Sequence, residues 1–137
     1  MDDKIRLMKR VVRELCDAIP GVLAVYRFGT TGTSYERMDS DLDLAVLAEQ
    51  EIAPERRFEI AQQVAVAAGR DVDVVDLRTA STVVRAQVVA NGERLFCQDS
   101  QRCDRFEDQV YSSYARLNEE RRGILMDIRQ RGTVYDG

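Results

Sequence analysis

The chain has 137 residues, the length of one ordinary domain. Its 20 Lys and Arg residues are outnumbered by 24 Asp and Glu residues, so it lacks the excess of positive charge that a general nucleic-acid binder needs. It contains no histidine, which excludes Ser-His-Asp triads, histidine general bases and histidine-ligated metals. A metal bound here must sit on oxygen ligands, which favours a hard ion such as Mg²⁺ or Mn²⁺.

The cysteine and hydropathy patterns indicate the environment in which the chain acts. Cys16, Cys97 and Cys103 are odd in number and form no Cys-x-x-Cys pair, which argues against a disulfide framework and a structural zinc site. Cys16 and Cys97 are therefore predicted to be small core residues. No apolar run reaches membrane-spanning length, and the acidic start does not resemble a signal peptide. We expect a cytoplasmic protein with no membrane partner.

The beginning of the chain predicts a helix followed by a buried strand. In residues 5–19, apolar side chains recur at steps of three and four, which is typical of an amphipathic helix. Pro20 and Gly21 then end it. Residues 22–28 are apolar and rich in β-branched and aromatic types, which predicts a buried strand that Gly29 stops.

A polar loop, a second strand and a second helix are expected next. Residues 30–39 are polar, and residues 42–47 have the composition of a strand. Pro54 occupies a first-turn position that helices tolerate, and Gly69 is a plausible C-terminal cap. The inward stripe of this helix is predicted to consist of Phe58, Ala61, Val64, Ala65 and Ala68.

The second half of the chain predicts two further strands and two further helices. Residues 72–76 form the third expected strand, and Ser81 is expected to cap a helix that runs to about Asn91. Residues 94–97 form a short fourth strand. Residues 101–131 are expected to be helical, with Gly123 loosening or dividing the helix. Its apolar stripe is predicted to comprise Phe106, Val110, Tyr114, Leu117, Ile124 and Ile128.

This order of elements predicts an α/β domain in which helices cover a mixed β-sheet, with a long C-terminal helix. We expect residues 1–98 to form the core and residues 99–137 to form a helical extension within a single domain overall. The apolar stripe of that extension is expected either to pack against the core or to dock a partner.

Two carboxylates stand at the start of the second predicted strand. Asp41 and Asp43 are two residues apart, so their side chains point to the same face of the strand. Adjacent carboxylates repel each other unless a cation holds them, and a divalent metal would resolve that cost. Ser40 can orient one carboxylate by hydrogen bonding. A calcium loop is a poor alternative because Leu44 stands where an EF-hand requires glycine.

The bend after the first strand adds a phosphate-binding element. Glycine at position 29 allows the backbone to approach a ligand closely, and Thr30 supplies a hydroxyl. A triphosphate could lie between this bend and metals on the Asp41 pair, where an α-phosphate would be positioned for in-line attack. Asp73, within the third strand, is predicted to be a third metal ligand or the base for an incoming hydroxyl. A surface position on an edge strand is the alternative for Asp73.

These residues resemble a known signature. Gly29-Thr30, ten residues and then Asp41-Leu42-Asp43 resemble the Gly-Ser, loop, Asp-x-Asp pattern of the DNA polymerase β-type nucleotidyltransferase superfamily. The likeness is greatest to the minimal nucleotidyltransferases, and among them to MntA-type antitoxins that are paired with HEPN-domain toxins. Residues 71–81 and 131–135 also resemble that group.

The resemblance implies a specific activity. Such antitoxins transfer AMP from ATP to a tyrosine of the partner HEPN ribonuclease and release pyrophosphate, which implies a hetero-oligomer and no direct binding of nucleic acid. In this chain Asp41, Asp43 and Asp73 would then be the catalytic and Mg²⁺-binding residues. Gly29, Thr30 and Ser40 would bind the ATP.

The chain also departs from the family pattern. Thr31 and Thr33 stand where basic residues are usual, and their neutral side chains are expected to bind the triphosphate more weakly. Arg27 and Arg37 are the candidates to supply the missing positive charge. Two other functions stay open at this point. One is an antitoxin that acts by binding alone, and the other is nucleotidyl transfer to a small molecule.

Overall fold

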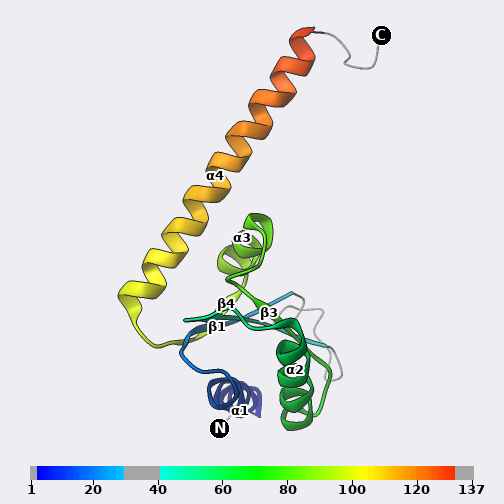
Figure 1. Cartoon of the computed structure of the whole chain (residues 1–137), viewed down its shortest axis with the longest axis vertical. Coiled ribbons are helices and arrows are strands. Elements are labelled where there is room, and N and C mark those ends of the chain that lie inside the picture. The colour runs from blue at the N-terminus through cyan, green and yellow to red at the C-terminus, as the bar shows by residue number, and fades with distance from the viewer. Residues whose placement is uncertain (1–2, 30–40, 132–137) are drawn as a thin grey trace.

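The computed structural model describes residues 3–29 and 41–131, with the side chains of 125 and 127–131 left aside. Helices and strands follow in the predicted order (Figure 1). They are α1 (Asp3–Ala18), β1 (Val22–Phe28), β2 (Leu42–Ala48), α2 (Pro54–Ala68), β3 (Val72–Asp76), α3 (Thr82–Asn91), β4 (Glu93–Cys97) and α4 (Ser100–Arg131). None of the described helices is both long and apolar enough to cross a membrane.

The four strands form one mixed sheet, as predicted, and their order in it is β3-β2-β1-β4. β1 is antiparallel to both β2 and β4, whereas β2 and β3 are parallel and are connected through α2. The register pairs Phe28 with Asp43 on one side of β2 and Asp43 with Asp73 on the other. The start of the central strand β2 therefore lies between the end of β1 and the start of β3, so these three strand ends are neighbours in the sheet.

Helices cover both faces of the sheet, because β1 and β2 are apolar on both sides. On one face α1 and α2 pack over a core that includes Val11, Leu44 and Val64. On the other face α3 and the beginning of α4 pack over a second core that includes Tyr26 and Val88. Figure 1 shows α1 and α2 below the sheet and α3 and α4 above it.

Local capping confirms where several elements begin and end. Pro54 occupies the first turn of α2, and Gly69 ends that helix at a φ of 71° with its amide bonded to the carbonyl of Ala65. The Ser81 hydroxyl accepts a hydrogen bond from the Val84 amide at 3.2 Å, as expected of an N-cap. The inward stripe of α2 was predicted wrongly at Phe58, whose side chain is 66% exposed.

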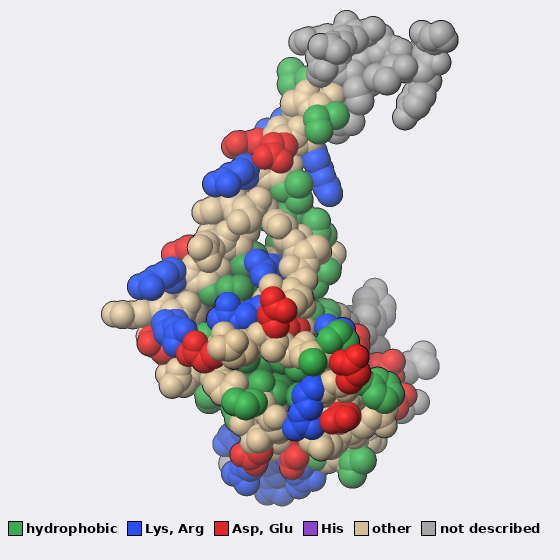
Figure 2. All heavy atoms as spheres, viewed as in Figure 1, with side chains coloured by type: hydrophobic (Ala, Val, Ile, Leu, Met, Phe, Trp, Pro, Cys, Tyr) green, Lys and Arg blue, Asp and Glu red, His purple; other side chains and the backbone are tan. Residues whose placement is uncertain are grey.

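α4 is one long helix that leaves the body of the molecule (Figure 1). Cys103 and Val110 are buried near its start, but Tyr114 and Ile124 of the predicted stripe are exposed. The helix runs without interruption through Gly123, so the prediction that this glycine divides it is wrong. Figure 2 shows hydrophobic and charged side chains together on the part that projects.

Candidate active site

The bend after β1 is shaped for glycine. Gly29 has a φ of 76°, in the left-handed region that side chains other than glycine disfavour. A Cβ atom at this position would lie 2.2 Å from Oδ2 of Asp43, far inside van der Waals contact. The backbone of the bend therefore presses directly against the Asp43 carboxyl group, which accounts for the glycine and joins two of the predicted site residues.

Asp43 lies at the centre of the candidate site. It is the second residue of β2, it is half-buried, and its strand neighbours are Phe28 of β1 and Asp73 of β3. The Leu42 amide donates to the Asp71 carbonyl at 2.9 Å, which fixes the start of β3 beside the start of β2. Because paired residues of neighbouring strands project from the same face, Asp43 and Asp73 share a face.

The electrostatics of Asp43 link three of the predicted residues. Burial raises the pKa of Asp43 most, and the negative charges of Asp73 and Asp41 raise it further. Asp41 and Asp73 are both exposed, so Asp43 is the inner member of a cluster that opens to solvent. A positive charge placed among these groups would offset both the cost of burying the Asp43 charge and the repulsion between the carboxylates.

The donor set suits a hard divalent cation. Three carboxylates supply only oxygen ligands, which are the ligands that Mg²⁺ and Mn²⁺ prefer. In the described part of the chain, no three carboxylates or thiols lie close enough together to enclose a metal ion as they stand. Of the pair at the start of β2, the Asp41 carboxylate is exposed and the Asp43 carboxylate is half-buried.

The described part of the chain does not bring together every residue predicted at the site. Thr30 and Ser40, together with Thr31, Thr33 and Arg37, fall outside the described residues. The structure places Arg27 away from the Asp43 carboxylate, which does not support its expected role at the phosphates. Its neighbours on β1 face the carboxylate side, and alternation turns Arg27 to the opposite face, where it lies beside α1 and pairs with Glu93.

Comparison with known proteins identifies the family. The family model for polymerase β nucleotidyltransferases matches residues 11–101, which span the four strands, α2, α3 and the second half of α1. The chain belongs to the polymerase β nucleotidyltransferase family. This nucleotidyltransferase is 38% identical over 119 residues to the protein adenylyltransferase MntA of Shewanella oneidensis, across 87% of this chain and 85% of MntA.

Solved structures resemble the nucleotidyltransferase over most of its length. A chain of a toxin–antitoxin crystal structure with AMP-PNP is 37% identical, with a TM-score of 0.79, and the match covers 89% of this chain and 98% of that one. A chain from the complex of tri-AMPylated Shewanella oneidensis HEPN toxin with MNT antitoxin is 38% identical, with a TM-score of 0.76. That match covers 90% of this chain and 97% of the other. The mixed sheet with a long C-terminal helix is therefore the fold of these antitoxins.

Asp76 of the nucleotidyltransferase shows what the sequence patterns missed. It is fully buried at the end of β3 and accepts hydrogen bonds from the amides of Ile52 at 2.9 Å and Arg78 at 3.0 Å. The bond to Arg78 is the turn cap expected for an aspartate at this place. The bond to Ile52 ties the loop before α2 to β3, and only the tertiary structure reveals it. Asp76 thus supports the strand that carries Asp73.

Proposed function

We propose that this nucleotidyltransferase is an antitoxin that transfers AMP from ATP to a tyrosine of a partner HEPN ribonuclease and thereby inactivates it in the cytoplasm. The observation that carries the proposal is its 38% identity to the protein adenylyltransferase MntA across 87% of the chain. Its likeness to an antitoxin seen with AMPylated HEPN toxin, and to one seen with AMP-PNP, supports the same donor and the same class of acceptor.

The proposed site uses the residues at the end of β1 and the starts of β2 and β3. Asp41 and Asp43 would hold Mg²⁺, and Asp73, opposite Asp43 in register, would complete the acidic set. Gly29 brings the backbone of the bend to the phosphates, and Thr30 and Ser40 contribute hydroxyl groups. Mg²⁺ held by these carboxylates would neutralise the charge that develops on the phosphate oxygens.

The chemical step moves one AMP group. The tyrosine oxygen forms a bond to the α-phosphorus of ATP, and the bond from that phosphorus to the bridging oxygen of pyrophosphate breaks. The phenolic proton passes to the carboxylate of Asp73, which is exposed and able to exchange it with solvent. Asp43 is held against the bend by the contact at Gly29, so it keeps its place beside the reacting phosphate.

Partner binding is proposed for α4. We divide the chain at residues 98 and 99, with a catalytic core before this point and a helical extension after it. The exposed apolar residues Tyr111, Tyr114, Ile124 and Met126 lie on α4, most of them beyond the part that packs against the sheet. An amphipathic helix that projects from its own domain suits docking into a groove of a partner, which would give a hetero-oligomer of antitoxin and toxin.

The test uses the purified chain, the HEPN protein encoded beside it, ATP and Mg²⁺. Mass spectrometry of the toxin is expected to show a gain of one or more AMP groups on tyrosine, and its ribonuclease activity is expected to fall in parallel. Omission of Mg²⁺ is expected to prevent both changes, since the carboxylates then repel the triphosphate. An unmodified toxin under the full conditions would contradict the proposal.

The Asp43→Asn variant separates catalysis from occupancy. It removes one charge and preserves shape, so it is expected to bind the toxin but leave it unmodified and active. If Asp43→Asn still inhibits the toxin as well as the wild type does, the chain acts by binding alone. If small hydroxylated compounds accept AMP while the toxin does not, the acceptor has been assigned to the wrong class.

A further inference from the structure

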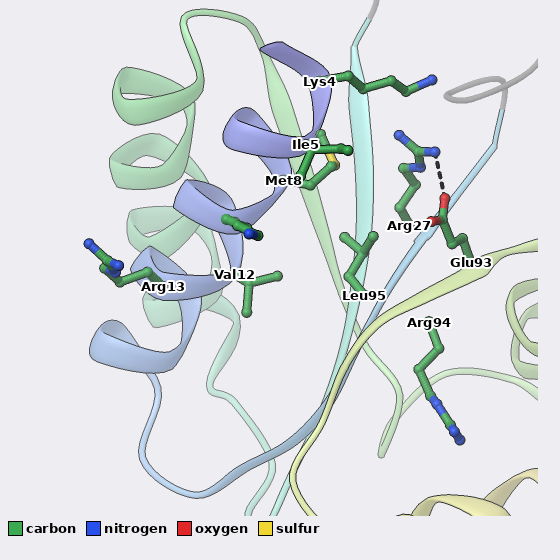
Figure 3. Close-up of a pocket in the computed structure, with 10 residues that line it drawn as sticks. Lys4, Ile5, Met8, Val12, Arg13, Arg27, Glu93, Arg94 and Leu95 are labelled. Atoms are coloured by element: carbon green, nitrogen blue, oxygen red, sulfur yellow. Dashed lines mark hydrogen bonds and ion pairs between the residues drawn. The ribbon is translucent and has the colours of Figure 1, made fainter. Parts of the chain in front are cut away.

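A groove separates α1 from the edge strand β4. It encloses about 460 Å³, within the range of small-molecule sites. Its floor is apolar and is formed by Ile5, Met8 and Val12 of α1 and Leu95 of β4. Figure 3 shows Arg27 reaching up from β1 into the space between the two elements, beside Glu93.

Arg27 is a buried cation with unused donors. The residue is only 8% exposed, and its Nη2 donates to Oε2 of Glu93 at 2.5 Å. Its Nε and Nη1 atoms are buried and have no hydrogen-bond partner among the described residues. Buried polar groups in native proteins nearly always have a hydrogen-bond partner. The two unpaired donors of the Arg27 guanidinium therefore indicate a missing acceptor. A ligand in the groove would supply it.

The charges around the groove favour an anion. Lys4 and Lys9 of α1 line it together with Arg27, and Glu93 is the single acidic residue among the lining residues of the described chain. Arg13 is a lining residue as well, but Figure 3 shows its guanidinium group on the side of α1 away from Arg27. Arg94 is also a lining residue, but its Nη1 lies 2.6 Å from Glu107 of α4, so its charge is already engaged. The Glu93 side chain is 60% exposed, so solvent weakens its hold on Arg27.

The groove lies on the face of the sheet opposite the carboxylate cluster. Leu42 and Leu44 of β2 point into the core under α1 and α2, which places the alternate residue Asp43 on the other face. Arg27 lines the groove beside α1, on the α1 side of the sheet. A ligand bound at Arg27 would therefore be separated from the nucleotide site by the thickness of the sheet, and the two sites need not compete.

We propose that this groove is a second binding site, for a small molecule with an anionic head on an apolar body. The head, a phosphate or a carboxylate, accepts a hydrogen bond from one of the two unpaired nitrogens of Arg27, Nε or Nη1. The apolar body lies on Ile5, Met8 and Leu95. The inference does not depend on the proposed AMP transfer, because it rests on residues outside the carboxylate cluster.

The test uses the anionic amphiphile 8-anilinonaphthalene-1-sulfonate as a fluorescent probe of the full chain. Wild-type protein is expected to bind it saturably, and higher salt is expected to weaken binding. Arg27→Met is expected to weaken binding about tenfold or more, because a charged hydrogen bond is lost. Its matched control is Arg102→Met, which removes an arginine paired with Glu49 outside the groove and should leave binding unchanged.

A second variant keeps the test decisive if Arg27→Met unfolds. Ile5 is 48% exposed, so Ile5→Glu should fold, and its negative charge should repel the probe from the groove. Phe58→Glu, at an exposed apolar residue of α2, is the matched control and should bind as the wild type does. Equal weakening by Ile5→Glu and Phe58→Glu would overturn the proposal, as would probe binding that neither Arg27→Met nor Ile5→Glu changes.

Competition identifies the head group and excludes the nucleotide site. Octyl phosphate and octanoate are titrated separately against the bound probe, and displacement by either one supports the proposal. The competitor that binds more tightly shows whether the groove prefers a phosphate or a carboxylate head group. If neither displaces the probe, the proposal fails. AMP-PNP with Mg²⁺ should leave the probe in place, and its displacement would show that the probe had occupied the nucleotide site instead.

Discussion

Substituting Gly29 by alanine tests the contact between the bend and the Asp43 carboxylate. The new Cβ would lie 2.2 Å from Oδ2 of Asp43, whereas ordinary contact begins at 3.4 Å. The carboxylate oxygen must therefore move by about 1 Å, and a misplacement of that size in a catalytic constellation lowers the rate by about 100-fold. The same substitution also strains a residue at a φ of 76°.

Gly69→Ala separates the backbone strain from the clash. Gly69 has nearly the same φ, 71°, but a Cβ there meets nothing within 4 Å. The left-handed conformation costs roughly 1–2 kcal/mol for alanine, partly offset by the lower entropy of the unfolded chain. Both variants are thus expected to lose about 1 kcal/mol of unfolding free energy in urea titrations, and Gly29→Ala should lose somewhat more.

The activity assay then decides between the two effects. The rate of AMP transfer to the toxin is expected to fall about 100-fold in Gly29→Ala and to stay at the wild-type value in Gly69→Ala, measured where both are fully folded. Equal activities in the two variants would refute the reasoning, because the contact with Asp43 would then have no catalytic consequence.

Four further outcomes follow from the structure. Asp73→Asn should lower AMP transfer by about 10²–10⁴-fold with toxin binding intact, as measured by initial rates and by co-purification, and an unchanged rate would remove Asp73 from the site. Gly123→Ala, within the continuous α4, should raise the unfolding free energy by up to about 1 kcal/mol, and a loss would indicate that the helix is broken there. Leu44→Ala should cost about 2–5 kcal/mol in urea unfolding because Leu44 is fully buried, and a cost below 1 kcal/mol would contradict the packing. Burial raises the pKa of Cys103 to about 11 from an ordinary 9.0, so alkylation of its thiol should be slow at pH 8. Because the unfolded chain loses this proton at a lower pH than the folded chain does, the free energy of unfolding should fall as the pH rises from 9 toward 11. Fast labelling of the folded chain at pH 8 would be the contrary result.

The strands and helices were predictable because local chemistry decides them. The apolar run that forms β1 and the capping at Ser81 and Gly69 each act within a few residues, so their signals are present in the sequence. The pairing of Asp43 with Asp73 was partly predictable, because two acidic residues in apolar strands need a common explanation. Their parallel register, however, depends on the crossover through α2.

Other features depend on tertiary contacts that periodicity does not encode. Phe58 fits the stripe of α2 but is exposed, whereas α2 buries Val64, as predicted, and Ile60, which the predicted stripe left out. Gly123 weakens a helix by only about 1 kcal/mol, too little to break one of this length. Arg27 was named as a candidate phosphate contact from its closeness in the sequence to Gly29, whereas strand alternation turns it toward α1.

The most direct measurement of the central claim is a crystal structure with AMP-PNP and Mn²⁺, in which anomalous scattering locates the metal. The proposed site predicts Mn²⁺ bonded to carboxylate oxygens of Asp41 and Asp43, with the triphosphate against the backbone at Gly29 and the α-phosphate facing Asp73. Metal and nucleotide bound elsewhere, with these three carboxylates uncoordinated in a fully occupied complex, would contradict it.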